Sequence, residues 1–513
     1  MATSSKPADE SSRLYGALPN DQDFDSMISD AKFTADTRTD FYDRSLTSRR
    51  YALVGVACSR IVTLINHGVF GVTMTKMHVV NTSVNPLPLQ GDILALALNL
   101  IVTSCTESTG LIHGISLRSA LASESRLHFN TNLRLLTAAR GWYSPNGTLF
   151  NGISAVLLII SYSSASLVVC LDVSFTYDVL AIAGTPLFVL GFALLLQVII
   201  ALSAMRAVKI LTWSSSPFDL TAALVHHTQL TPATLRCMHC VSDLDTDGGP
   251  AKPSEIQPSA WHAHPSIRKV VISLWVIVAA CAGWAALVTY ISHNHSKDTS
   301  IPMTTKTWSF LPNQSSSYIL YFMPGVNLEV WILLFVNIAV IQGPLTLGLH
   351  CSELIANVIR DERQWRCATG RKGLRTMMNP VKTIFTRPIC LILFLAKPFL
   401  HWMFGLSFQI YNDIFDGAPP RLSIWNLCIA LFIFASFFTF VARGRPCGPQ
   451  PAAYGHLQTL ANLVDEWSPV MWWGHKEDGI PYCHAGTSDH PLPDVKMDCV
   501  YASSGAGPLV PFS

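Results

Sequence analysis

Long apolar stretches alternate with polar segments along most of this 513-residue chain. An α-helix needs about 20 mostly apolar residues to cross a bilayer, and eight stretches meet or approach that length. They predict an all-α membrane protein with about eight transmembrane helices within residues 46–442. The first is the most polar, because Arg60 and His67 interrupt it. The predicted helices are 51–73, 90–113, 150–171, 179–204, 269–291, 327–350, 388–411 and 422–442.

The remaining segments are polar. Residues 1–45 lack both apolar periodicity and the apolar core of a cleavable signal peptide, so we expect them to be disordered. In the C-terminal tail, apolar residues recur at helical spacing near 452–467, which predicts an amphipathic helix. Its apolar face is expected either to pack on the bundle or to bind a partner or lipid surface. The segments long enough to fold or bind something are 114–149, 205–268, 351–387 and the tail 443–513.

Composition and charge support the membrane class and give it an orientation. The chain is 50% hydrophobic and only 13% charged, whereas a soluble domain has about 25% charged residues. Its net charge of +2 indicates neither a basic surface for nucleic acid nor an acidic tail. Basic residues are retained on the cytosolic side of membrane proteins. With both termini cytosolic, 29 of the 35 Lys and Arg residues fall on that side, which favours eight helices over seven.

Sequons and cysteines agree with this orientation. The sequons at Asn81, Asn294 and Asn313 fall in predicted outer loops, where glycosylation occurs, whereas the sequon at Asn146 falls inside and is expected to stay unmodified. None of the 13 cysteines lies in a predicted outer loop. We therefore expect reduced thiols and no loop disulfides.

Several ionisable side chains fall within the predicted helices or at their inner ends, where they are costly and often functional. By helical rise, Glu107 and Lys397 lie roughly 9 and 14 Å from the inner ends of their helices, so we predict that they interact. Reversing both charges should then restore the folding that each single reversal removes. The residues of this polar cluster are Arg60, Glu107, His113, His350, Glu353, Lys397 and His401.

Three interpretations of the cluster are open. One is a buried ion pair that fixes helix packing. A second is a polar cavity, open toward the cytosol, for an ion, a proton or a small solute. A third is that the long side chains reach the membrane surface.

Signs of a metal site or of catalysis are few. Cys237 and Cys240 have the spacing of zinc ligands, but the second pair that a structural site needs is missing, so free thiols are favoured. The acidic stretch that begins at Asp243 resembles a calcium loop, but it has Ser254 where the loop requires Glu. Nucleotide-loop, nucleophile-elbow and zinc-helix motifs are absent. The sequence therefore indicates no cofactor, and it leaves open only an enzyme of unfamiliar type.

Six motifs stand out: IHGISLRSAL from Ile112, FNTNLRLL from Phe129, TWSSSPFDLT from Thr212, QPSAW from Gln257, TLGLHCSELIANVIRDERQWR from Thr346, and GPQPAAYGHLQTLANLVDEW from Gly448 with WWGHK and HAGTS after it. Together they resemble a family of uncharacterised fungal multi-pass integral membrane proteins. The resemblance implies a similar fold but no activity, substrate or catalytic residue. Because every motif falls on a predicted cytosolic segment or inner helix end, it also implies that the function involves the cytosolic face.

Two hypotheses about function follow. The first is transport or binding of an ion or small solute by the polar cluster. The alternative is a membrane scaffold or sensor whose cytosolic face and tail bind a protein partner. In either case the chain resides in the lipid bilayer of the plasma membrane or an endomembrane and has no nucleic-acid partner.

Overall fold

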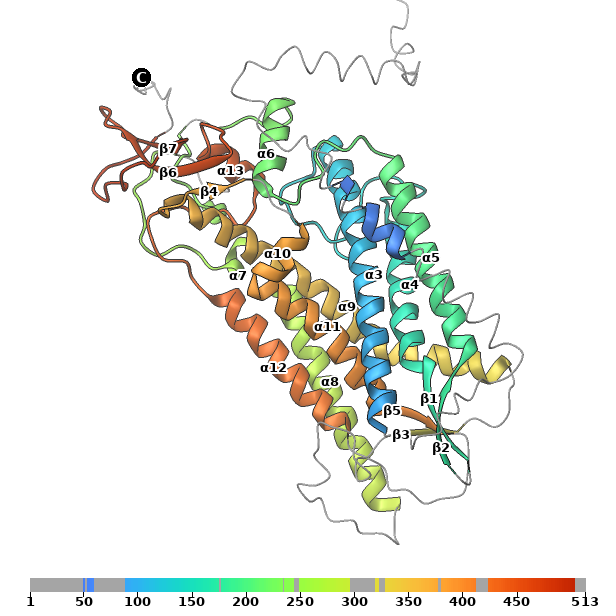
Figure 1. Cartoon of the computed structure of the whole chain (residues 1–513). Coiled ribbons are helices and arrows are strands. Elements are labelled where there is room, and N and C mark those ends of the chain that lie inside the picture. Colours follow the sequence, from blue (N-terminus) through green and yellow to red (C-terminus); the bar gives the residue numbers. More distant parts are fainter. Residues whose placement is uncertain are drawn as a thin grey trace, which may run out of the picture.

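The structure, a computed structural model, describes residues 49–50, 53–59, 88–174, 177–233, 235–243, 249–295, 319–322, 328–376, 380–411 and 423–502. Within these ranges, seven helices are long and apolar enough to cross a membrane (Figure 1). Such helices are the architecture of a multi-pass membrane protein, because each satisfies its own backbone hydrogen bonds. They are α3 Pro88–Ser123, α4 Thr148–Val168, α5 Gly184–Arg206, α8 Pro265–His295, α9 Leu328–Trp365, α11 Pro388–Ser407 and α12 Ser423–Arg443.

These seven helices correspond to the last seven of the eight predicted ones. Of the first, 51–73, the structure describes only residues 53–59, which are helical. Arg60 and the segment 1–45 lie outside the described residues. The total of eight helices therefore stays a prediction.

The connection between α4 and α5 is longer than predicted. Helix α4 ends at Val168 rather than at 171, and α5 begins at Gly184 rather than at 179. The residues between them form an antiparallel hairpin of β1 Val169–Ser174 and β2 Tyr177–Ile182. Four of the twelve are valine or isoleucine, which favour strands. Cys170 lies in β1, within this connection. The sequence-based expectation was that no cysteine lies in a predicted outer loop, and the position of Cys170 differs from it.

Three helices extend beyond their predicted transmembrane ranges. Helix α3 continues past residue 113 to Ser123, α9 continues past residue 350 to Trp365, and α8 has four more residues at each end. The helical spacing of apolar residues within 351–368 predicts the extension of α9, whereas that of α3 was not predicted. The extensions of α3 and α9 bury apolar side chains, such as Leu117 and Ile355, against the adjoining loops and tail. Packing therefore extends each helix beyond its apolar membrane-length stretch.

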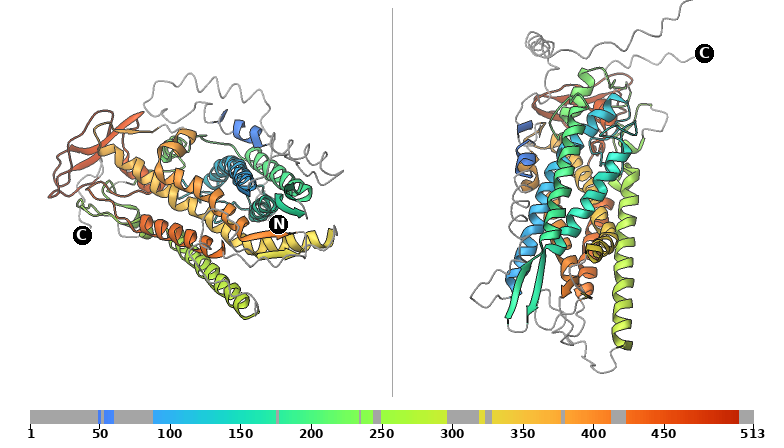
Figure 2. Two further views of the ribbon diagram at one scale, coloured as in Figure 1. Left: turned by 60° about the horizontal axis from the view of Figure 1, so that its bottom comes forward. Right: turned by 90° about the vertical axis from the view of Figure 1, so that its right-hand side faces the viewer.

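The helices form two groups that meet side by side (Figure 2). Helices α3, α4 and α5 pack on one another, as do α8, α9, α11 and α12. The groups are joined where α3 contacts α11 and where α4 contacts α9. At one end of the bundle, β3 Ile319–Phe322 pairs in parallel with β5 Phe408–Tyr411.

The other end of the bundle, which we call the tail end, carries the long polar segments and the described part of the tail, 443–502 (Figure 1). There β4, β6 and β7 form a three-stranded antiparallel sheet in that order. The elements at this end are α6 Pro217–His226, η1 Val241–Asp243, α7 Ala260–Ala263, η3 Arg366–Thr369, β4 Leu374–Arg375, α10 Pro380–Thr386, α13 Leu457–Leu463, β6 Val470–Glu477 and β7 His484–Ser488.

The predicted amphipathic helix at 452–467 is too long. The helix in this region, α13, spans only Leu457–Leu463, because Tyr454 and Gly455 have positive φ angles before it and Val464 is extended after it. Its apolar residues, among them Leu457 and Leu460, are fully buried in the tail end. They therefore belong to a packed core and are not a free surface.

The extension of α9 anchors the tail. The carboxylate of Glu362 accepts hydrogen bonds from the amides of Ala453 and Tyr454, at 2.9 and 2.8 Å. The indole of Trp365 donates to the carbonyl of Pro451 at 2.8 Å. One helix therefore connects the membrane-spanning bundle to the folded tail.

Candidate functional site

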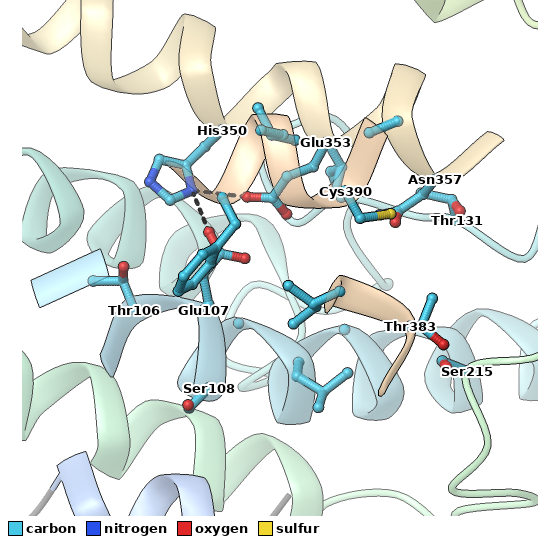
Figure 3. Close-up of a pocket in the computed structure, with 18 of the residues that line it drawn as sticks. Thr106, Glu107, Ser108, Thr131, Ser215, His350, Glu353, Asn357, Thr383 and Cys390 are labelled. Carbon is cyan, nitrogen blue, oxygen red and sulfur yellow. Dashed lines mark hydrogen bonds and ion pairs between the residues drawn. The ribbon is translucent and has the colours of Figure 1, made fainter. Parts of the chain in front are cut away.

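Three helices bring the central charges of the polar cluster together. Lys397 of α11 is 1% exposed, and its ammonium donates hydrogen bonds to Glu107 of α3 and to Glu353 of α9. His350, one turn before Glu353, places Nδ1 2.9 Å from Oε1 of Glu353 and 3.9 Å from Oε1 of Glu107 (Figure 3). The predicted contact between Glu107 and Lys397 is present, but it is part of a larger cluster.

The other predicted cluster residues lie apart from this centre. His401 follows Lys397 by one turn and stacks on Tyr162 with ring centroids 3.8 Å apart. Its Nδ1 is 3.0 Å from Nε2 of Gln342. His113 is fully buried in α3.

A cavity of about 520 Å³ lies beside the charged centre, a volume typical of small-molecule sites. One face of α3 lines it from Ser104 to Arg118, a distance of roughly 21 Å. Residues of α9, α10 and α11 line the other side. In Figure 3 the cavity-lining side chains extend from His350 and Glu107 at one end to Thr383 and Ser215 at the other.

The carboxylates are accessible from the cavity, whereas the ammonium is not. The side chains of Glu107 and Glu353 are 28% and 24% exposed, against 1% for Lys397. Two glycines of α3, Gly110 and Gly114, also line the cavity, and a Cβ at either would meet no atom within 4 Å. The small residues therefore keep space open along α3.

The half of the cavity toward the tail end is basic. Arg118 donates to the side chain of Asn130 at 2.6 Å and to the carbonyl of Ser214 at 3.0 Å. Arg360 pairs with Asp361 at 2.8 Å. Arg134, from the loop between α3 and α4, also lines the cavity, and its buried Nη1 has no hydrogen-bond partner among the described residues. Burial lowers the pKa of Arg134 against the opposing effect of Glu353 and Glu107.

Arg134, Tyr162 and Gln342 are not among the residues of the predicted polar cluster. Arg134 belongs to the FNTNLRLL motif, but charge counting treats that loop only as cytosolic. Tyr162 and Gln342 are uncharged residues within apolar runs, yet the hydroxyl of Tyr162 donates to Thr103 at 3.0 Å and Gln342 contacts His401. Their lack of formal charge is the reason that a search for ionisable groups passes over them.

Metal binding has one candidate site among the described residues. Glu107, His350 and Glu353 each offer a ligand atom, and these atoms lie within 4.8 Å of one another. The ammonium of Lys397, however, already donates to both carboxylates. A tethered cation therefore occupies the position that a metal ion would take.

Among the described residues, neither zinc candidate belongs to a group of three close ligand atoms. Cys237 is buried in the core of the tail end. The thiol of Cys240 donates to Asp243 at 2.8 Å, and burial together with this hydrogen bond raises the pKa of Cys240 to about 11. Zinc requires a thiolate, which such an environment disfavours.

The sequons are described only in part. Asn146 is fully buried, and it bonds with Ser116 and with the carbonyl of Ala204. Asn294 lies in the last turn of α8, at the end of the bundle away from the tail. Asn81 and Asn313 lie outside the described residues.

Comparisons of the chain with protein-family models, with curated proteins and with solved structures found no match. The resemblance to fungal membrane proteins therefore stays a prediction from the motifs.

Proposed function

We propose that this protein binds a small solute in the cavity between α3, α9 and α11 and carries it across its membrane. The observation that supports this proposal is that Glu107 and Glu353 face a cavity of about 520 Å³ rather than a dry helix contact. A buried ion pair that only fixed helix packing would need no such space, since tight packing of its neighbours would stabilise it better.

The orientation belongs to the same proposal. We place the tail end, and both termini, in the cytosol, with an eighth helix formed by 51–73. The support is the strong bias of Lys and Arg toward this end of the bundle. The cavity reaches Arg118 and Ser215 near that end, so the solute would enter from the cytosol.

The scaffold or sensor alternative loses its strongest support. The apolar stripes at 351–368 and 452–467 are the docking surfaces that the sequence suggests, and their residues Ile355, Leu457 and Leu460 are at most 1% exposed. A partner would have to use other parts of the tail end.

A matched pair of glycine variants tests the proposed function. Gly114 lines the cavity and Gly283 of α8 is exposed on the outside of the bundle, and a Cβ at either meets no atom within 4 Å. Gly114→Trp should fill the cavity, and Gly283→Trp should not. Metabolite and ion contents are compared among cells that lack the gene and cells that express each variant.

Gly114→Trp should reproduce the solute changes of the gene deletion, and Gly283→Trp should behave as wild type at equal protein levels. Wild-type solute contents in cells with folded Gly114→Trp protein would rule out transport through this cavity.

A further inference from the structure

The charges around the cavity do not balance. Lys397 is shared by Glu107 and Glu353, and Arg360 is paired with Asp361. Arg118 is held by two neutral oxygen acceptors, from Asn130 and Ser214. The histidines are counted as neutral. The net charge is then +1, from four lining cations and three acids: Arg118, Arg134, Arg360 and Lys397 against Glu107, Glu353 and Asp361.

Arg134 is the lining cation whose hydrogen-bonding capacity is least used. Its Nη1 is buried without an acceptor among the described residues, although a guanidinium carries five N–H donors. Glu353 and Glu107 attract the charge of Arg134, but both carboxylates already accept hydrogen bonds from Lys397. A buried donor without an acceptor costs about 1–3 kcal/mol. Because Arg134 lines the cavity, an oxyanion bound there would supply the acceptor once the guanidinium turns toward it.

The cavity wall next to these cations is apolar. Leu111 and Ile115 lie on the α3 side, and Leu393 and Phe394 lie on the α11 side. A small inorganic ion would leave this surface in contact with water, whereas an organic body would cover it.

We propose that the solute is an organic anion, with a carboxylate or phosphate group bound by Arg134 and an apolar body between α3 and α11. This inference rests on the proposed function and specifies its substrate class. A cationic solute is disfavoured, because the only acids that face the cavity directly in the described structure, Glu107 and Glu353, already bind the ammonium of Lys397.

Three probes of one shape test the charge preference. Benzoate, benzamide and benzylamine are titrated against the purified full-length protein in lipid nanodiscs at pH 7, with inorganic phosphate as a fourth probe. Binding is measured by calorimetry and by the shift in thermal unfolding temperature. The variants are Arg134→Gln, Arg134→Lys, Gly114→Trp and, as control, Arg371→Gln, which changes an exposed arginine at the same end of the bundle.

Benzoate should bind and raise the unfolding temperature, whereas benzamide and benzylamine should not. Arg134→Gln should weaken benzoate binding about tenfold or more, the usual effect of losing a charge-assisted hydrogen bond. Arg134→Lys, which keeps the charge, should lose less, and Arg371→Gln should bind as wild type. If Arg134→Gln fails to fold, the Arg134→Lys variant and the probe series still decide the question.

If benzamide and benzoate bind equally well and Gly114→Trp abolishes both, the preference for an anionic solute is wrong. The cavity would still be a solute-binding site. Unchanged benzoate binding in Arg134→Gln would also overturn the organic-anion proposal. If neither benzoate nor phosphate binds, the organic-anion proposal is also wrong. The proposed transport function would then be tested separately by the cellular comparison of Gly114→Trp with Gly283→Trp.

Discussion

Lys397 holds together two carboxylates that come from different helices. Its ammonium is buried, and Glu107 and Glu353 both accept its hydrogen bonds. Removing the ammonium would leave two acids close together inside the bundle. Lys397→Met should therefore lower the free energy of unfolding by about 3 kcal/mol or more, measured by denaturant titration in detergent. Lys372→Met, at an exposed position, should have almost no effect.

Because Lys397 binds two carboxylates, a pairwise charge swap is not enough. Glu107→Lys with Lys397→Glu would place a new carboxylate beside Glu353. Stability should return only when Glu353→Gln is added to the swap. Full recovery in the double variant would mean that Glu353 does not contact Lys397 in the membrane.

His484, in the tail, makes stability depend on pH. Burial would lower the pKa of His484, but hydrogen bonds with Asp465, Cys237 and the carbonyl of Ala502 raise it to about 10. The folded protein thus holds this proton more tightly than the unfolded chain, whose histidine has a pKa near 6.5. The contribution is complete below pH 6.5 and is lost as pH rises toward 10.

Thermal unfolding between pH 6 and 10 should therefore show a fall in stability that is smaller in His484→Gln. His490→Gln, which changes an exposed histidine, should keep the wild-type pH dependence. A slope that is identical in wild type and His484→Gln would contradict the assignment.

At the level of elements, Gly455 sets how the tail docks on α9. Its φ is +72°, and a Cβ there would lie 2.7 Å from Oδ2 of Asp361. That carboxylate is buried and already accepts from Asn130 at 2.8 Å, so it has little room to move. Gly455→Ala should destabilise the tail by roughly 1–3 kcal/mol.

Limited proteolysis of the full-length protein checks this effect, with faster cleavage in the tail expected for Gly455→Ala. Gly249→Ala serves as control, because a Cβ at Gly249 meets no atom within 4 Å. Equal cleavage rates in the two variants would show that α9 tolerates a side chain at Gly455.

The sequence predicts the long helices well and the tail poorly, for a physical reason. A membrane-length apolar run is a local property, and α12 at Ser423–Arg443 lies within one residue of its predicted range, 422–442. The predicted helix near 452–467 is helical only in part, because Tyr454 and Gly455 interrupt it with positive φ angles. Part of its apolar side packs against the sheet of β4, β6 and β7. Such long-range partners leave no local periodic pattern.

The candidate site shows the same division. Lys397 and Glu107 were predictable, because charges inside apolar runs are conspicuous. Arg134 was not, since nothing in a polar loop indicates that it folds back against a cavity. The partnership of Lys397 with Glu353 likewise depends on how α9 and α11 pack.

For the whole molecule, the number of helices decides where the two ends lie. With the eighth helix at 51–73, tags at the N- and C-termini should both be cytosolic. Selective permeabilisation of the plasma membrane admits antibodies to the cytosol but not to the interior of organelles. After this treatment, antibodies should stain both tags. Tags on opposite sides would show that 51–73 does not cross.

Glycosylation offers an independent check of the same topology. Any glycan should be lost in a combined Asn81→Gln, Asn294→Gln and Asn313→Gln variant, read out as a mobility shift with a deglycosylating enzyme. A glycan that persists in this variant and is lost in Asn146→Gln would reverse the orientation.

Helix α9 acts geometrically as a lever. It runs unbroken from Leu328 to Trp365, with His350 and Glu353 at the cavity, Pro344 before them and the tail anchored beyond them. A tilt of about 10° at Pro344 would displace Trp365 by roughly 5 Å, since 21 residues of helix span roughly 31 Å. A small rearrangement around the solute would thus be magnified at the tail, where a fluorescent label would report it.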